Sequence, residues 1–218
     1  MILIKEVISL FYWIIIIVIA PKIFKTNLEL NRKFVHIMIS NWWFMAIAFF
    51  DKFIYASVVP LIFVFINLYA TFGKSKRFVA ELKRDNTDFS LGLICYPIGY
   101  LIALYLAYNY CGYSAGIGIM ALGYGDGFAA IIGKKIDFMP YYIWGNKKTI
   151  SGTIGMFLCT FISILVYCFF FKLEPMIYIA LISAFVGSAI EAVAVKGTDN
   201  ILIPLTVILS YIILGVYL

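Results

Sequence analysis

Three ionisable side chains lie within strongly apolar stretches of the chain, where a charge is costly. They are His36, Asp126 and Glu191. Ionisable residues inside membrane-type segments generally mark functional sites, because each needs a counter-charge, a metal ion or a polar cavity. Carboxylates bind divalent cations, and both carboxylate and imidazole groups transfer protons. These residues are therefore the first candidates for a catalytic or metal-binding site.

Asp126 lies in a run in which every second residue is glycine, at Gly123, Gly125 and Gly127. Three glycines so placed weaken a helix by roughly 1 kcal/mol each, and Asp is a favourable N-cap. The pattern predicts a helix broken near Gly123–Gly127, with a half-helix N-terminus that favours anions inside the membrane. At about 1.5 Å per residue, Asp126 would lie near 10 Å below the membrane surface. The alternative is close helix packing through glycine, with Asp126 as a cap only.

A second group of candidates combines lysines with hydroxyl groups. The segment 133–149 ends in two lysines, and the following apolar stretch begins with hydroxyl residues and a glycine. Lysines and hydroxyls at a helix start suit phosphate, although ordinary loop charge is the alternative. A P-loop is excluded, since no G-x-x-x-x-G precedes the lysines. The candidate phosphate-binding residues here are Lys134, Lys147, Lys148, Thr149 and Ser151.

Two further candidates, Arg32 and Asp199, complete the set. Arg32 and His36 are four residues apart and share one helix face, where a structural role for His36 is the alternative. Glu191 is close to the end of its apolar stretch, and Asp199 follows it within Lys196–Asn200. Glu191 could instead form a structural ion pair.

The elements that carry these residues are apolar stretches long enough to be membrane helices. The chain is 64% hydrophobic with a mean hydropathy of +1.02, and a transmembrane helix needs about 20 apolar residues. We expect an all-α, polytopic protein, with residues 1–218 as a single integral membrane domain and no soluble domain. The first stretch has no basic leader or cleavage site and is expected to remain in the protein. The eight predicted spans are Val7–Ala20, Phe34–Phe50, Phe53–Phe72, Leu91–Tyr110, Tyr113–Ile132, Ile150–Phe171, Pro175–Val195 and Ile201–Tyr217.

The loops between these spans alternate in charge. Of the 17 Lys and Arg residues in the chain, all but Lys5, Lys52 and Lys172 fall in segments 21–33, 73–90, 133–149 and 196–200. The positive-inside bias places these segments in the cytoplasm, with both termini outside. Lys74–Arg84 reads as an amphipathic helix resting on anionic lipid. The pI near 9 reflects this asymmetry, so no nucleic-acid partner is expected.

The topology places the candidate residues at one face of the membrane, although they come from separate segments. Carboxylates, lysines and a helix N-terminus gathered at the cytoplasmic face indicate a metal-bound polyphosphate. An adjoining apolar wall indicates a lipid co-substrate. The four cysteines lie in or beside apolar spans without a C-x-x-C pair, so a zinc site or disulfide framework is not expected.

Four stretches resemble the phytol kinase and dolichol kinase family, which also includes CTP-dependent diacylglycerol kinases and is distantly similar to phosphatidate cytidylyltransferases. They occur in family order across most of the chain, and the third and fourth are the more specific. One departure is Lys148-Thr-Ile-Ser-Gly152, which lacks the acidic residue that is common in the family. The stretches are Arg32–His36; Arg84 with Ser90–Pro97; Gly125–Lys134 with Asn146–Gly152; and Glu191 with Gly197–Asn200 and Pro204.

The resemblance implies a kinase that transfers the γ-phosphoryl group of a nucleoside triphosphate, CTP, to an isoprenoid alcohol such as phytol, geranylgeraniol, farnesol or dolichol. The implied cofactor is Mg²⁺, held by Asp126, Glu191 and Asp199. Asp126 and His36 would be catalytic, and phosphates would be bound by the basic and hydroxyl residues named above together with Gly125 and Gly127. A prokaryotic plasma membrane is the expected location.

The alternatives are a cytidylyltransferase that makes a CDP-activated lipid, a CTP-dependent diacylglycerol kinase, and a non-enzymatic lipid transporter. The family's cytidylyltransferases end in a glycine-rich motif with paired aspartates, which is replaced here by Lys196-Gly-Thr-Asp-Asn200. A transporter needs polar groups through the whole membrane, whereas the outer half of this chain has almost none.

Overall fold

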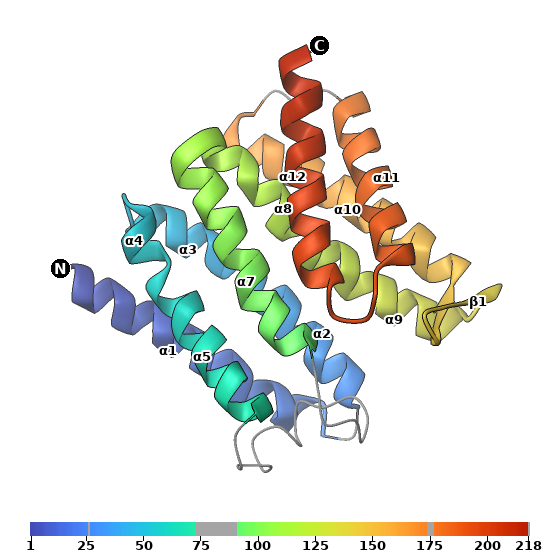
Figure 1. The fold of residues 1–218 in the computed structure, drawn as a ribbon, viewed down its shortest axis with the longest axis horizontal. Coiled ribbons are helices and arrows are strands. Elements are labelled where there is room, and N and C mark those ends of the chain that lie inside the picture. Colours follow the sequence, from blue (N-terminus) through green and yellow to red (C-terminus); the bar gives the residue numbers. More distant parts are fainter. Residues whose placement is uncertain (26, 73–90, 174–176, 218) are drawn as a thin grey trace.

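The computed structural model describes residues 1–25, 27–72, 91–173 and 177–217, and these are overwhelmingly helical (Figure 1). The predicted amphipathic segment Lys74–Arg84 lies outside the described residues. The helices are α1 (Ile2–Ile23), α2 (Leu28–Ser40), α3 (Trp42–Phe49), α4 (Phe53–Ala56), α5 (Val58–Phe72), α7 (Leu91–Leu106), α8 (Gly116–Met120), α9 (Asp126–Ile136), α10 (Ile150–Phe171), α11 (Ile177–Val193) and α12 (Asp199–Tyr217).

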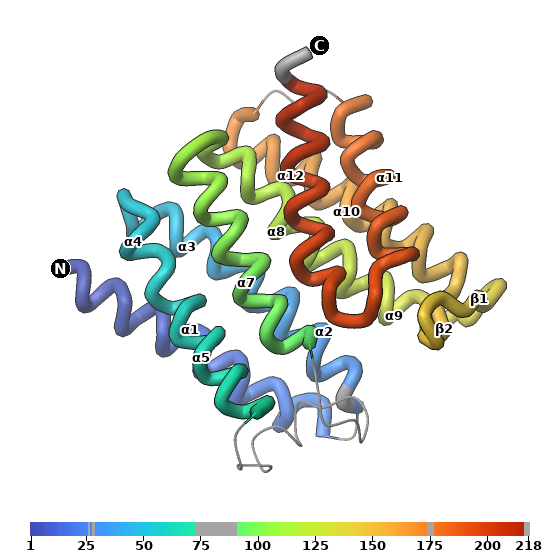
Figure 2. Tube along the Cα trace, in the orientation of Figure 1, coloured from blue at the N-terminus to red at the C-terminus, as the bar shows by residue number. Residues whose placement is uncertain are grey.

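Among the described residues, four helical stretches are long and apolar enough to cross a bilayer. They are Ile2–Ile23, Phe53–Phe72, Leu91–Ile136 and Ile150–Phe171, and two shorter apolar helices span Ile177–Val193 and Asp199–Gly215. Within Leu91–Ile136 the chain reverses after α7, so that α8 packs against α7 and runs in the opposite direction (Figure 2). The chain is therefore an all-α integral membrane protein, while the number of eight crossings stays a prediction.

The predicted break near Gly123–Gly127 is not present. Between α8 and α9 the chain forms a π-helical segment, Ala121–Gly125, and the helix continues without interruption. Asp126 has φ −64° and ψ −33°, which are right-handed helical values. Its side chain makes no capping bond at the start of α9. Neither the half-helix N-terminus nor the capping role expected of Asp126 is found.

Close packing explains why a glycine-rich segment remains helical. A Cβ atom on Gly127 would lie 2.6 Å from Cγ1 of Ile37, and one on Gly123 would meet Ser40; both partners belong to α2. On another face, a Cβ on Gly125 would collide with Thr160 of α10. The glycines let α2 and α10 approach the helix backbone, and this contact compensates for their low helix propensity.

The segment between α9 and α10 contains a small antiparallel hairpin, which the sequence analysis treated as a loop. Strand β1 (Pro140–Ile143) pairs with β2 (Asn146–Thr149), and Tyr141 lies opposite Lys148. The two turn residues, Trp144 and Gly145, have φ of +53° and +73°. Positive φ at both positions is the geometry of a type I′ turn, which matches the twist of paired strands.

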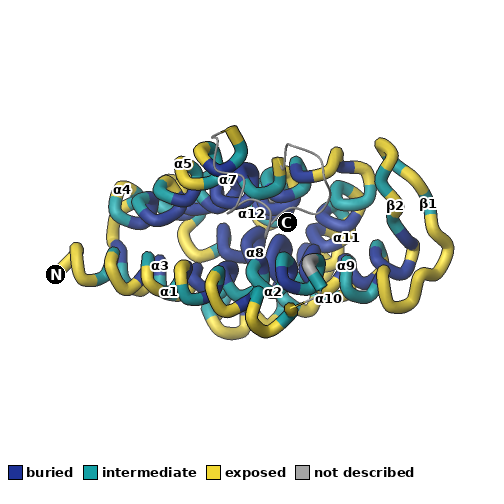
Figure 3. Tube along the Cα trace, turned by 90° about the horizontal axis from the view of Figure 1, so that it is seen from below, coloured by how far each residue is buried: buried dark blue, intermediate teal, exposed yellow. Residues whose placement is uncertain are grey.

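The interior is built around large aromatic side chains. Trp13, Trp42 and Tyr100 are almost completely buried, and the Trp13 and Trp42 rings meet edge to face. Trp43 donates a 2.8 Å hydrogen bond from Nε1 to the Tyr167 hydroxyl, which joins α3 to α10. Buried residues fill the middle of the assembly and exposed ones cover its outside (Figure 3). At one end gather the start of α2, the end of α9, the hairpin and the α11–α12 connection.

Candidate functional site

A polar cavity of about 640 Å³ opens where these elements meet. Its walls come from α2, α9, β2, α10, α11 and the connection before α12. The cavity is lined by both signs of charge. The charged lining residues are Glu29, Arg32, Lys33, Asp126, Lys134, Asp137, Lys147, Lys148, Glu191, Lys196 and Asp199.

The most buried charges in the cavity form an ion pair between α2 and α9. Lys33 Nζ donates hydrogen bonds of 2.7 and 2.6 Å to the two carboxylate oxygens of Asp126. The side chains are only 4% and 7% exposed. Helix α2 approaches α9 closely at Gly127, where the Lys33 carbonyl oxygen is one of the neighbouring atoms. This close approach brings the two charged groups together. An unpaired charge at this depth would be strongly unfavourable, so each residue depends on the other.

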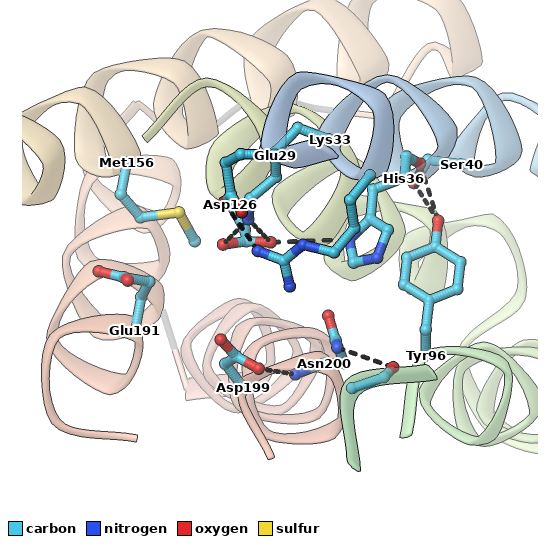
Figure 4. Close-up of polar contacts among 12 residues, drawn as sticks. Glu29, Lys33, His36, Ser40, Tyr96, Asp126, Met156, Glu191, Asp199 and Asn200 are labelled. Carbon is cyan, nitrogen blue, oxygen red and sulfur yellow. Dashed lines mark hydrogen bonds and ion pairs between the residues drawn. The ribbon is translucent and has the colours of Figure 1, made fainter. Parts of the chain in front are cut away.

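His36 lies behind this pair and does not line the cavity. Its Nδ1 atom is 3.8 Å from Asp126 Oδ2, which is too long for a hydrogen bond. The imidazole ring packs on Tyr96 with ring centroids 4.3 Å apart. Tyr96 donates a 2.8 Å hydrogen bond to the His36 carbonyl oxygen and is within 3.0 Å of the Ser40 hydroxyl (Figure 4). His36 is therefore placed to support Asp126 from inside the protein.

On the opposite wall, Lys148 of β2 is paired with Glu191 of α11. Lys148 Nζ donates a 2.8 Å hydrogen bond to Glu191 Oε1 and another to the Glu191 backbone carbonyl. This is the ion pair that the sequence analysis left open as an alternative to a metal-binding role for Glu191. The contact also fastens the hairpin to the end of α11.

Two more cations at the cavity mouth have acidic partners. Arg32 is 2.8 Å from Glu29, and Lys147 is 2.8 Å from Asp137. The hydrogen bond to Asp137 raises the pKa of Lys147. Among the described residues, Lys134 forms no ion pair. Most of the cationic side chains that line the cavity are thus paired with carboxylates, so the charge of the cavity is largely balanced within the protein.

The start of α10 forms another part of the wall. Thr149 Oγ1 accepts a 3.1 Å hydrogen bond from the Gly152 amide, and Ser151 Oγ donates to the same atom at 3.1 Å. Thr149 is thus the N-cap of α10. The Thr149 hydroxyl lines the cavity, whereas Ser151 does not. The first turn of α10, including Gly152, presents its positive end to the cavity.

Asp199 faces Asp126 across the cavity, from the start of α12 (Figure 4). Asp199 accepts a hydrogen bond of 3.0 Å from the Asn200 amide. Asn200, which is 2% exposed, donates from Nδ2 to the Gly92 carbonyl oxygen of α7 at 3.1 Å. This bond fixes the α11–α12 connection, and with it Asp199, to the core.

The three predicted metal ligands do not form a compact group. Asp126, Glu191 and Asp199 all line the cavity. Within the described ranges, however, no three His, Cys, Asp or Glu side chains lie close enough together to hold a metal ion. Asp126 and Glu191 are instead engaged by lysines, which leaves Asp199 as the carboxylate without an ion pair among the described residues.

The chain is similar to a phytol kinase. The match to the phytol kinase of Synechocystis sp. has 31% identity over 94 residues, which is 42% of this chain and 40% of the kinase. The chain therefore matches less than half of that kinase's length. No protein-family model and no solved structure matches the chain.

The structure brings most of the predicted site residues together, and adds Lys33. Gly125 and Gly127 lie at helix contacts rather than in the lining. Lys33 was not predicted, because it reads as an ordinary basic residue before an apolar span. Its signal was the spacing of Lys33, His36 and Ser40, which places all three on one face of α2. The predicted site residues that line the cavity are Arg32, Asp126, Lys134, Lys147, Lys148, Thr149, Glu191 and Asp199.

A second cavity, of about 720 Å³, is apolar and shares no lining residue with the first. Tyr124 and Phe128 contribute to it, two residues on either side of Asp126. At about 100° per helical residue, Phe128 points to the face of α9 opposite Asp126. The Tyr124 hydroxyl donates a 2.8 Å hydrogen bond to Asn41 at this cavity. Exposed aliphatic and aromatic side chains of α10, such as Ile162 and Phe170, form its outer wall.

Proposed function

We propose that the protein is a membrane-embedded kinase that phosphorylates the hydroxyl group of an isoprenoid alcohol. The observation that carries the proposal is the buried Lys33–Asp126 pair on the wall of a cation-lined cavity. The similarity to a phytol kinase and the membrane helices support the lipid class of the acceptor. The cavity volume is in the range of small-molecule sites.

The donor in this proposal is a nucleoside triphosphate, with CTP named by the family resemblance alone. Its phosphates would contact Lys134, Lys147 and Lys148, with Arg32 at the mouth of the cavity. The first turn of α10 would add its amide groups and positive dipole. Phosphoryl transfer requires mainly charge neutralisation and positioning, and these groups supply both.

The acidic residues fit a Mg²⁺ ion that arrives with the nucleotide. Mg²⁺ is bound by one or two carboxylates together with substrate phosphates, rather than by a cage of protein ligands. Asp199, whose carboxylate has no ion pair among the described residues, is the proposed protein ligand, with Glu191 at the edge of the site. The ion would neutralise negative charge on the phosphoryl group that is transferred.

The proposed mechanism exchanges ion-pair partners. When the nucleotide binds, Lys33 moves from Asp126 to a phosphate oxygen, and Asp126 is freed to accept the proton of the alcohol. The alcohol oxygen then forms a bond to the γ-phosphorus while the bond to the β–γ bridging oxygen breaks. The products are the lipid monophosphate and a nucleoside diphosphate. Between these steps Asp126 lies buried without its lysine, and the proton that it accepts from the alcohol neutralises it.

We further infer that the chain crosses the membrane eight times and that the cavity faces the cytoplasm. Residues of three of the four predicted basic segments, 21–33, 133–149 and 196–200, line the cavity, and the positive-inside bias assigns that side.

The test is a direct assay of the purified protein in lipid nanodiscs. The protein is incubated with Mg²⁺, γ-labelled CTP or another γ-labelled nucleotide, and phytol, geranylgeraniol, farnesol, dolichol or diacylglycerol. We expect label in an isoprenoid monophosphate and release of a nucleoside diphosphate, both abolished by Asp126→Asn. Pyrophosphate release would instead identify a cytidylyltransferase. Folded protein that labels none of the alcohols would contradict the proposal.

A further inference from the structure

The β1–β2 turn contains a residue that type I′ geometry does not favour. Trp144 adopts φ +53°, a left-handed conformation in which Asn and Gly are preferred and bulky residues are uncommon. The residue is 71% exposed, and its Nε1 atom donates a 2.9 Å hydrogen bond to the Val193 carbonyl oxygen. The indole is thus held in a fixed orientation with most of its surface uncovered. Backbone strain of this kind persists where the surroundings or the function require it.

Trp144 belongs to an exposed apolar patch at the rim of the charged cavity. Tyr142 of β1 is also 71% exposed and lies opposite the exposed Lys147 in the strand register. Lys135 is exposed at the end of α9, before β1. Trp and Tyr at the level of the headgroups, with nearby lysines, are typical of the membrane–water interface. The apolar members of the patch are Ile136, Phe138, Met139, Tyr142, Trp144, Val193 and Val195.

The patch is continuous with the surface that faces lipid. Ile150 directly follows β2, and Ile150, Ile154 and Leu158 are exposed along α10, one of the long apolar helices. The hairpin lies at the outer edge of the helix assembly in the view from below (Figure 3). The same bilayer that covers α10 therefore reaches the hairpin.

We propose that the β1–β2 hairpin is an interfacial anchor, with Trp144 and Tyr142 inserted into the headgroup region of the nearer leaflet. Lys135, which does not line the charged cavity, faces anionic headgroups there. Because β2 also carries Lys148 and the N-cap Thr149, the anchor holds one wall of the charged cavity at the membrane surface. This inference concerns the bilayer as partner and stands apart from the proposed kinase activity.

The test compares the tryptophan fluorescence of the protein with that of Trp144→Phe in nanodiscs. The other three tryptophans, Trp13, Trp42 and Trp43, are buried and common to both proteins, so the difference spectrum reports Trp144. Lipids brominated close to the glycerol end of the acyl chain should quench most of this difference signal. Aqueous iodide should quench it only weakly. Stronger quenching by iodide than by brominated lipid would overturn the proposed anchor.

Trp144→Asn provides the matched variant, because Asn suits the left-handed turn better than Trp. A role in the turn alone predicts unchanged or higher thermal stability and unchanged accessibility of the hairpin to proteases in nanodiscs. The anchor predicts faster hairpin cleavage in nanodiscs despite the better turn residue, and no difference between the two proteins in detergent. Quenching of Trp144 by CTP rather than by brominated lipid would show that the ring binds the nucleotide base, and would reject the anchor.

Discussion

At the scale of single residues, the ion pairs explain how so many charges can line one cavity near the membrane. Lys33 and Asp126 are both buried and neutralise each other, while Lys148 and Glu191 do the same on the opposite wall. A buried pair of this kind contributes little net stability, yet its disruption is costly because one charge is left alone. Its retention is better explained by function than by folding.

Removal of either member of the buried pair should destabilise the protein, and removal of both should not. We expect Lys33→Met and Asp126→Asn each to reduce the free energy of unfolding by about 3–5 kcal/mol, because the partner stays buried without its counter-charge. The double variant should recover most of this loss and remain inactive. Denaturation in detergent micelles measures the effect. Additive losses in the double variant would show that the two residues are not coupled.

Metal-free nucleotide should bind more tightly when Asp126 loses its charge. Asp126→Asn frees Lys33 for phosphate, and one charge-assisted hydrogen bond corresponds to about tenfold in affinity. We expect calorimetry with CTP in EDTA to show this gain, and Lys33→Met combined with Asp126→Asn to remove it. Asp51→Asn is the matched control, since it removes one negative charge at an exposed position outside both cavities. An equal gain in that control would point to net charge alone.

At the scale of elements, helix packing sets the geometry of the site. The glycines between residues 123 and 127 bring α2 and α10 against one helix, and Asn200 ties the start of α12 to α7. The same packing leaves the apolar cavity between α3, the π-helical segment and α10, and this cavity has the walls that a lipid chain requires.

Filling the apolar cavity should weaken the use of the lipid without affecting the nucleotide. Ser163 on α10 lines this cavity, and Ser163→Phe would occupy part of its volume. We expect a higher KM for the alcohol and an unchanged KM for the nucleotide. Ser210→Phe on α12 is the control, because Ser210 lies outside both cavities. Equal effects of the two variants would mean that the lipid chain binds elsewhere.

At the scale of the whole molecule, the charge asymmetry of the sequence corresponds to a physical end of the structure. The hairpin, the start of α2 and the α11–α12 connection surround the cavity, while the α7–α8 turn and the chain termini lie away from it. A charged site confined to one side suits an enzyme that takes a soluble substrate from one compartment and a lipid from the bilayer.

Cysteine labelling tests the orientation. A cysteine at Asn146, beside the cavity, should resist a membrane-impermeant reagent in intact cells and react after permeabilisation. A cysteine at Tyr110, which is 72% exposed near the other end, should react without permeabilisation. The native cysteines are buried or half-buried, so the background is low. The reverse pattern would invert the assigned topology.

The sequence was sufficient to predict the helical membrane class and most of the cavity lining, because hydropathy and loop charge are local properties. It was insufficient for Lys33, whose role depends on the contact of α2 with α9. The glycines around Asp126 were interpreted as a break, since local propensity ignores the packing of Ile37 on Gly127. The hairpin was missed because Trp144 is an unusual residue for its turn.

The π-helical segment before Asp126 also has a consequence for helical phase. A π-turn accommodates one residue more than an α-turn and is equivalent to a single-residue insertion. Each residue corresponds to roughly 100° of rotation, so a purely α-helical path through Ala121–Gly125 would turn the aspartate away from Lys33. Deletion of one residue from this segment should therefore preserve the pairing. Relatives without the insertion will align only with a one-residue gap before this aspartate.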